Sequence, residues 1–353
     1  MRIVVAMSGG VDSSVAAARL ASEGHEVVGL SMQLYDQRQG DLQFGSCCTI
    51  DDLHDARRVA RSLGIPHYIV NFEREFNERV LSNFIGEYTL GRTPIPCVHC
   101  NGDLKFAALL DRARGLEAEA VATGHYARVE RDESGGYLLL RGADHSKDQS
   151  YFLFTLTQGQ LASARFPVGD MTKDDVRAAA RALGLSVAEK PDSQELCFVA
   201  GGDHAAFVEQ HAPELVGAGV IADRDGRVLG RHDGTHRFTI GQRKGLGLST
   251  GLPLYVVDID AADRRVVVGP RDALERRTLT ASEVNWISGR TPSTPVRASA
   301  RIRYRHREAD ATITPLPDSR ARVDFIEPQS AITPGQAVVF YDGEMVLGGG
   351  WID

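Results

Sequence analysis

The stretch RIVVAMSGGVDSS, residues 2–14, decides how this chain begins to fold. Residues 2–7 are mostly apolar and β-branched, which is typical of a strand buried inside a parallel sheet. The next segment, VAAARLASEG at residues 15–24, predicts a helix that ends at Gly24. A buried strand, a glycine-rich loop and a helix in this order predict the first unit of an α/β fold.

The loop between the predicted strand and helix carries SGGVDSS. Consecutive glycines let several backbone N–H groups point into one concavity, and Ser8, Ser13 and Ser14 add hydroxyl donors. The start of the helix adds about half a positive charge. This loop predicts an anion cradle suited to pyrophosphate, and the alternative is a plain helix cap made by the serines.

The same alternation continues along the first part of the chain. Strands are predicted at residues 25–34, 67–72 and 119–127, and helices at residues 51–63 and 105–114. This order predicts a doubly wound parallel sheet, with ligands at the carboxyl ends of its strands.

The remainder of the chain has a different pattern. Short β-like runs rich in glycine fill residues 221–270, and an all-β segment of hairpins runs from about residue 275 to the end. We therefore expect an α/β domain at residues 1–203, a small β-rich central domain at 204–272 and a C-terminal β-barrel at 273–353.

Composition excludes several classes of protein. The 353 residues are 42% hydrophobic and 25% charged, which excludes a disordered or fibrous chain. No apolar run approaches the roughly 18–20 residues of a membrane span, and MRIVVAMSGG is no signal peptide, so we expect a cytoplasmic protein without a membrane partner. A net charge of −7 argues against indiscriminate coating of nucleic acid but allows a local basic patch.

Five cysteines stand at Cys47, Cys48, Cys97, Cys100 and Cys197. An odd number in a reducing compartment is a poor disulfide framework, and the C-x-x-C pair indicates catalysis or a metal. Cys47 and Cys48 are interpreted as structural or incidental.

The phosphate loop resembles that of the PP-loop ATP pyrophosphatases, which split ATP into AMP and pyrophosphate to adenylate an acceptor. It lacks the lysine of the G-x-x-x-x-G-K-[ST] loop. Asp12 inside an anion cradle makes sense if Mg²⁺ bridges it to the phosphates, so ATP and Mg²⁺ are expected.

The cysteine segments TPIPCVHCN (93–101) and KPDSQELCF (190–198), with TGHYARV (123–129) and KDQSYFL (147–153), resemble the tRNA-specific 2-thiouridylase (MnmA) family. FTIGQRKGLG (238–247), RIRYRH (301–306) and PGQAVVFY (334–341) extend the resemblance over nearly the whole chain. It implies that Cys100 is the nucleophile and that Cys197 carries sulfur as a persulfide, followed by a disulfide between them. It also implies a sulfur-donor protein, either a cysteine desulfurase or a sulfur-relay carrier.

A metal-dependent sulfur carrier is the alternative at the same cysteines. Cys97, Cys100 and Cys197 could supply three thiolates to a [4Fe–4S] cluster, and zinc would need His99 as a fourth ligand. Some members of the family have Asp at the position of Cys97, so the C-x-x-C pair is not constant.

The resemblance implies that residues 1–203 form the PP-loop ATP pyrophosphatase catalytic domain and that the barrel at 273–353 binds tRNA, and it assigns binding residues. Those for the nucleotide are Ala6, Met7, Ser8, Gly9, Gly10, Val11, Asp12, Ser13, Met32, Gly124, Lys190 and Asp192, with a catalytic role for Asp12. Those for tRNA are Ile95, Pro96 and Cys97 at the target base, then His125, Lys147, Asp148, Gln149, Arg303, Tyr304 and Gln336. From the residues alone, Met32 is ordinarily a core residue and His125 is equally well explained as a structural histidine.

One basic stretch indicates RNA without reference to any family. In residues 301–307, RIRYRHR, a strand would place four arginines on one face, where they could meet several phosphates; a solvated barrel strand is the alternative. For the substrate that the family resemblance implies, a wobble uridine in an anticodon loop, the base would be flipped into a closed pocket so that the enzyme could reach its C2 oxygen.

The function predicted from the sequence is therefore ATP-dependent tRNA uridine 2-sulfurtransfer. Two rivals stay open: another PP-loop adenylating ligase of the amidating type, and an RNA-binding protein that uses ATP only as a conformational switch.

Overall fold

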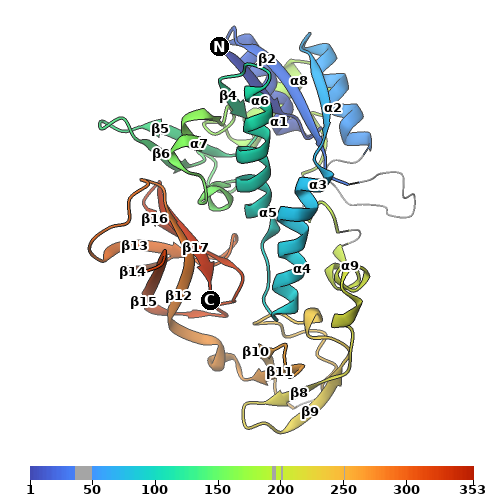
Figure 1. The fold of residues 1–353 in the computed structure, drawn as a ribbon, viewed down its shortest axis with the longest axis vertical. Coiled ribbons are helices and arrows are strands. Elements are labelled where there is room, and N and C mark those ends of the chain that lie inside the picture. Colours follow the sequence, from blue (N-terminus) through green and yellow to red (C-terminus); the bar gives the residue numbers. More distant parts are fainter. Residues whose placement is uncertain (36–49, 193–195, 200–201, 250) are drawn as a thin grey trace.

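The computed structural model describes residues 1–35, 50–192, 196–199, 202–249 and 251–353. Cys47, Cys48 and residues 193–195 of the second cysteine motif lie outside the described residues. Figure 1 shows an α/β domain at one end, a small sheet at the other and a barrel beside the helices that run between them. None of the helices in the described ranges has the length and apolar character of a transmembrane segment.

The N-terminal domain is built on a five-stranded sheet of order β3-β2-β1-β4-β7, in which every pairing is parallel. Its central strand pairs Val4 with Val28 on one side and with Val121 on the other. The strands are β1 (Arg2–Ala6), β2 (Glu26–Gln33), β3 (His67–Asn71), β4 (Ala120–Ala122) and β7 (Ala164–Arg165).

Helices cover both faces of this sheet, because successive residues of β1 point to opposite sides. Ile3 and Val5 pack against α1 (Val11–Ser22), α2 (Ile50–Ser62) and α8 (Lys173–Ala182). Val4 belongs instead to the core that contains α6 (Leu109–Arg114). The predicted doubly wound parallel sheet is confirmed.

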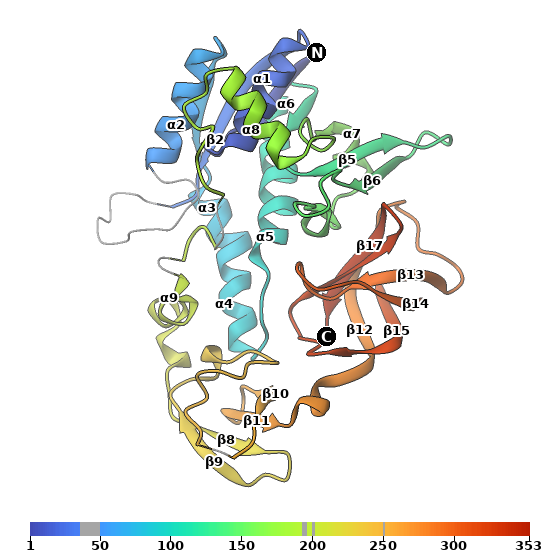
Figure 2. The same cartoon turned by 180° about the vertical axis from the view of Figure 1, so that it is seen from behind.

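Two long helical segments run from this sheet toward the central domain (Figures 1 and 2). The first joins α3 (Glu73–Phe76), a π-helical segment η1 (Asn77–Leu81) and α4 (Ser82–Thr89). The second joins α5 (Pro96–His99), a π-helical segment η2 (Cys100–Ala108) and α6. Between them, Gly91 approaches Ile259 of the central domain so closely that a Cβ would lie 3.1 Å from that side chain.

The central domain is a four-stranded sheet of order β10-β11-β8-β9 around a small core that includes Ile221, Val256 and Val266. Its elements are α9 (His204–His211), η5 (Pro213–Leu215), β8 (Gly219–Asp223), β9 (Val228–His232), η6 (Thr235–Arg237), β10 (Tyr255–Asp260), β11 (Arg265–Gly269) and η7 (Arg271–Leu274). The expected β-rich centre is confirmed.

The C-terminal strands form a closed antiparallel barrel, since β12 pairs with β15 on one side and with β17 on the other. The strands are β12 (Glu275–Trp286), β13 (Val296–Arg301), β14 (Ala309–Leu316), β15 (Arg320–Ser330), β16 (Ala337–Asp342) and β17 (Met345–Ile352). This confirms the predicted barrel.

A hairpin of the N-terminal domain extends the barrel sheet. It consists of β5 (Ala127–Arg131) and β6 (Tyr137–Arg141), and β6 pairs with β17 through Leu140 and Met345. Figure 2 shows this hairpin projecting beside the barrel. It is followed by η3 (Ser150–Leu153) and α7 (Gln158–Ser163). The two domains thus share one continuous sheet, which the sequence did not indicate.

The arginine stripe expected on one strand is wrong. β13 ends at Arg301, and residues 302–306 form bends and turns, so alternation along a strand does not apply there. Arg305 and Arg307 are exposed, while Arg301 and Arg303 are half-buried.

Candidate active site

The glycine-rich loop lies at the carboxyl end of β1 and turns tightly into α1. Gly9 has a φ of +75°, and a Cβ there would lie 2.2 Å from the backbone oxygen of Asp52. Ser13 Oγ accepts a hydrogen bond from the Ser8 N–H at 3.2 Å, which curls the loop. Gly10 is the N-cap residue of α1, and no side chain caps this end of the helix. The first backbone N–H groups of α1 therefore face the loop with no side-chain acceptor. This geometry suits a bound anion.

Gly124 follows β4 and closes the loop from the neighbouring strand. A Cβ at Gly124 would lie 2.6 Å from the Ser13 backbone nitrogen, so only glycine fits this approach. β1 and β4 flank the point where the strand order reverses, which is where α/β sheets bind ligands. Met32, at the end of β2, is buried in the core that includes Phe72.

A cluster of charged side chains stands beside the loop. The Lys173 ammonium group donates to both carboxylate oxygens of Asp12, at 2.8 and 2.9 Å, and lies 2.6 Å from Asp192. The Tyr126 hydroxyl also donates to Asp12, at 2.7 Å, and Lys147 donates to Asp192 at 2.7 Å. Lys147, expected at the RNA surface, is thus joined here to Asp192, expected at the nucleotide.

Burial raises the pKa of Asp192, but hydrogen bonds from Lys147 and Lys173 outweigh it, so this pKa lies below its usual value. The pKa of Tyr126 is raised by burial and by the charge of Asp12. The cluster therefore holds the charged Asp192 carboxylate and a neutral Tyr126 phenol that serves as a hydrogen-bond donor.

A second lysine joins the loop to α2. Lys190 donates to the Gly9 carbonyl at 3.0 Å and to Asp52 and Asp55 at 2.6 Å each. Burial lowers the pKa of Lys190, and its hydrogen bonds to the two aspartates raise that pKa above its usual value overall. Lys190 is therefore a cation at the loop, as expected for a phosphate site.

Cys97 and Cys100 lie on one helical segment. Pro96 occupies the first position of α5, where its missing N–H removes no helical hydrogen bond. Cys97 is exposed and Cys100, half-buried, begins the π-helical segment η2. Such segments are frequent at functional sites because they alter the direction of side chains.

The barrel touches this segment through an aromatic stack. The His99 ring stacks on Trp351 of β17 with centroids 4.6 Å apart and an interplanar angle of 4°. His99 Nδ1 also lies 3.1 Å from an Asp103 carboxylate oxygen.

Cys197 lies at the same hydrophobic core. Both Cys100 and Cys197 pack against it, and Phe198 anchors the second segment through edge contacts with Phe76 at 5.5 Å and Phe84 at 5.1 Å. No disulfide joins these cysteines within the described ranges.

The cysteines do not form a cluster site in this structure. Among the described residues, no three His, Cys, Asp or Glu side chains are grouped as metal ligands would be. The [4Fe–4S] ligand set of Cys97, Cys100 and Cys197 is therefore not assembled, nor is a zinc site that would include His99.

Gln336 meets the segment that leads to the cysteines. Its side-chain amide donates to the carbonyls of Thr93, at 2.9 Å, and Pro94, at 3.3 Å. Ile95 packs against the main core, and the following Pro96 is buried. The structure thus joins the predicted target-base segment to the predicted RNA contact on the barrel.

Tyr304 and Arg303 lie at the edge of the barrel next to the N-terminal domain. The Tyr304 ring packs on Phe152 with centroids 4.4 Å apart, and Arg303 donates to the Ser330 carbonyl at 3.1 Å. Burial lowers the pKa of Arg303. Contact of these two residues with RNA stays a prediction.

Three further residues predicted to bind tRNA make contacts within the protein itself. His125 is buried and its Nδ1 lies 2.7 Å from Thr123 Oγ1, which is the environment of the structural alternative. Asp148 is buried and lies 3.5 Å from Arg141 and from Arg301. Gln149 accepts a hydrogen bond from the Tyr126 N–H at 3.1 Å.

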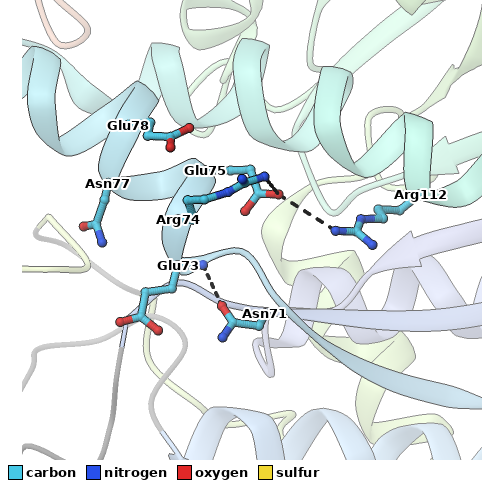
Figure 3. Close-up of a pocket in the computed structure, with 7 residues that line it drawn as sticks. All are labelled: Asn71, Glu73, Arg74, Glu75, Asn77, Glu78 and Arg112. Carbon is cyan, nitrogen blue, oxygen red and sulfur yellow. Dashed lines mark hydrogen bonds and ion pairs between the residues drawn. The ribbon is translucent and has the colours of Figure 1, made fainter.

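A separate depression of about 640 Å³ lies beyond the end of β3 (Figure 3). Arg112 forms an ion pair with Glu75 across it, and the Glu73 N–H donates to Asn71. Arg74, Asn77 and Glu78 complete its lining, and none of these residues belongs to a predicted site.

Sequence reasoning missed Lys173, Tyr126 and Trp351, and also Asp52 and Asp55 of α2. Lys173 is 161 positions from Asp12, and TKDD indicates only a helix cap, which Thr172 and Asp175 do form. No local pattern could have placed its side chain at the loop.

Comparisons with known proteins cover the whole chain. Residues 1–201 match a family model described as the tRNA methyl transferase HUP domain. Residues 205–270 match the tRNA methyl transferase PRC-barrel domain, and residues 276–352 match the aminomethyltransferase beta-barrel domain.

Curated relatives resemble the chain from end to end. The tRNA-specific 2-thiouridylase MnmA of Geotalea uraniireducens is 57% identical over 100% of this chain and 95% of its own length. That of Geobacter metallireducens is 55% identical over 100% and 96%, and that of Solibacter usitatus is 53% identical over 99% of both. With identities of this size over its full length, the chain belongs to the tRNA-specific 2-thiouridylase (MnmA) family and is an enzyme.

Proposed function

We propose that this enzyme is an ATP-dependent tRNA uridine 2-sulfurtransferase that converts the wobble uridine to 2-thiouridine. One observation carries the proposal: the chain aligns from end to end, at 57% identity, with a protein named tRNA-specific 2-thiouridylase. The site geometry supports it, because the tight turn at Gly9 forms a loop suited to phosphate, and Ala6 just before it packs against the same core as Cys100 and Cys197.

The first half of the reaction makes the C2 oxygen of uridine a leaving group. That oxygen attacks the α-phosphorus of ATP, and pyrophosphate leaves. The loop from Ser8 to Ser13, the start of α1 and Lys190 supply donors and positive charge for the departing phosphates.

Mg²⁺ fits the carboxylates of this site. Asp12 and Asp192 both hold one cation in this structure, the Lys173 ammonium group, so the pair is arranged around a positive charge. Mg²⁺ commonly binds through one or two carboxylates and substrate phosphates. When bound, it would neutralise phosphate charge.

The second half replaces oxygen by sulfur. The terminal sulfur of a persulfide on Cys197 attacks C2, AMP leaves, and the base is joined to Cys197 through two sulfur atoms. The Cys100 thiolate then attacks the Cys197 sulfur, so a Cys100–Cys197 disulfide forms and the outer sulfur stays on the base as the thiocarbonyl. A thiol reductant supplies the two electrons that reset the pair, and a sulfur-donor protein reloads Cys197.

Recognition of tRNA is proposed for the junction between the barrel and the cysteine segment. Gln336 and Trp351 both contact the region of residues 93–99 in the RNA-free enzyme. RNA bound at the barrel would therefore lie next to the segment that carries Cys100.

The test is in vitro thiolation of unmodified tRNA with ATP, Mg²⁺, a sulfur source and reductant, followed by nucleoside mass spectrometry. We expect 2-thiouridine with the wild type and none with Cys100→Ser or Cys197→Ser. Cys97→Asp should retain activity, since family members carry Asp there. Normal thiolation by either serine variant would contradict the relay.

A further inference from the structure

We propose that Lys173 is a nucleotide-binding residue whose ammonium group donates to the phosphates of ATP and stabilises the departing pyrophosphate. Neither the loop motif nor the cysteine motifs include this residue. The inference deepens the proposed function and rests on the use of ATP at the glycine-rich loop.

Lys173 lies at the end of its helix where a positive charge is least favourable. It is the first residue of α8, where the backbone N–H groups already give a positive end. The helix is capped by Thr172, and Asp144 accepts the Lys173 backbone N–H at 3.0 Å. A cation at the N-terminus does not stabilise a helix, so helix stability does not explain why a lysine occupies this position.

Lys173 is also buried. Lys173 is 8% exposed, and lysine is rarely buried unless it is paired. Its three ammonium hydrogens are matched by three contacts, two with Asp12 and one with Asp192. The lysine therefore does not lie in this interior by chance, and its charge is directed at one point.

The surroundings of the Lys173 ammonium group also favour an anion. Asp12 lies in the first turn of α1, directly after the glycine loop, so the starts of α1 and α8 meet beside the lysine. Two helix N-termini and a buried ammonium group make a strongly positive locus in the nucleotide-free enzyme. The two carboxylates satisfy it in the absence of an anion.

Binding of the polyphosphate would exchange these partners. The ammonium group donates to phosphate oxygens in place of the carboxylates, and both carboxylates become available to a cation. Tyr126 keeps Asp12 oriented during the exchange, since its hydroxyl donates to Asp12 at 2.7 Å. Lys147 keeps its own contact with Asp192 at 2.7 Å.

The test measures anion binding rather than turnover. Binding of pyrophosphate and of ATP to the full-length enzyme is followed by titration calorimetry in EDTA, so that no divalent cation contributes. Lys173→Met removes the charge and keeps the length of the side chain. Lys105→Met is the control, because Lys105 is a half-buried lysine on another helical segment and donates to Asn101 at 2.9 Å.

We expect Lys173→Met to weaken pyrophosphate binding by about tenfold or more, the loss of one charged hydrogen-bond donor, and Lys105→Met to change it by less than about twofold. Lys173→Arg should restore binding to within a few-fold of the wild type. If Lys173→Met does not fold, Lys173→Gln keeps hydrogen bonds to the two carboxylates and should show the same loss of affinity.

Two outcomes are kept apart by this design. Wild-type enzyme that binds neither ATP nor pyrophosphate in EDTA, and still does not bind ATP when Mg²⁺ is added, would contradict the proposed function itself. Wild-type binding with equal affinity in the uncharged Lys173 variants, even with a lower melting temperature, would show a purely structural lysine and overturn the inference.

Discussion

Removal of the Asp148 carboxylate should destabilise the junction between the N-terminal domain and the barrel. The Asp148 side chain is 2% exposed, and one oxygen lies 3.5 Å from both Arg141 and Arg301. Its other oxygen accepts the backbone N–H groups of Gly142, at 3.3 Å, and Ser150, at 3.0 Å. It therefore joins β6, the loop after it and β13 in one buried ionic group.

The expected cost follows from what is left behind. Without the carboxylate, two guanidinium groups stay inside the protein, and breaking a buried pair in this way typically costs about 3–5 kcal/mol. Arg141 keeps an ion pair with Glu308 and lies 3.8 Å from the Tyr341 ring, so we expect the lower end, about 3 kcal/mol, for Asp148→Ala. Asp148→Asn, which keeps the shape and one acceptor, should cost less.

The two tryptophans of the chain make the assay selective. Trp286 lies in β12 and Trp351 in β17, so tryptophan fluorescence during urea unfolding reports on the barrel. Asp324→Asn is the control, since Asp324 is a half-buried barrel residue paired with the exposed Arg322 at 2.8 Å. It should cost less than about 1 kcal/mol.

The measurement is made on RNA-free enzyme. A midpoint for Asp148→Ala equal to that of the wild type would refute the structural role inferred from the burial of this group. The residue would then be better explained by its predicted contact with tRNA.

Three further perturbations test other parts of the structure. Gly9→Ala should abolish ATP binding because its Cβ would collide with the backbone of α2. Gly24→Ala is the control, since Gly24 has a similar positive φ of +82° but a Cβ there would meet no atom within 4 Å. Gly24→Ala should cost only about 1 kcal/mol of stability and retain ATP binding. Gln336→Glu should raise the rate of proteolysis in residues 90–100, because a carboxylate cannot donate to the two carbonyls of that segment; Gln329→Glu, whose amide donates only to nearby carbonyls of its own strand, should not. Burial lowers the pKa of His125 far below its usual value, so the imidazole stays neutral in the folded protein. In the unfolded chain it takes up a proton as the pH falls below about 6.5. The stability of the folded state is therefore fully present above that pH and is lost progressively below it. The melting temperature should therefore fall between about pH 7.5 and 5.5, and His125→Asn should lose part of this dependence; an unchanged pH profile would contradict the burial of a neutral imidazole.

Local patterns predicted the phosphate loop because its requirements are local. A strand, two glycines and a helix start are contiguous in sequence, and the structure shows the tight turn at Gly9 that these residues imply. The parallel sheet followed from the same kind of pattern, because strand and helix periods differ.

Long-range contacts could not be predicted in this way. The lysine that meets Asp12 is on α8, and the tryptophan that stacks on His99 is on the last strand. The arginine stripe failed for a related reason. Residues 301–307 alternate as a strand would, but tertiary packing ends β13 at Arg301 and turns the rest. Alternation in a short polar run does not determine where a strand stops.

The proposed reaction couples adenylation of the tRNA to its thiolation. The most direct measurement is single-turnover reaction of anaerobic enzyme, preloaded with sulfur, with radiolabelled ATP and unmodified tRNA, in which AMP, ADP and 2-thiouridine are quantified together. We predict one AMP for each 2-thiouridine formed, no ADP, and no AMP when uridine at the wobble position is replaced by cytidine. Formation of ADP, or of 2-thiouridine without a matching amount of AMP, would contradict the account.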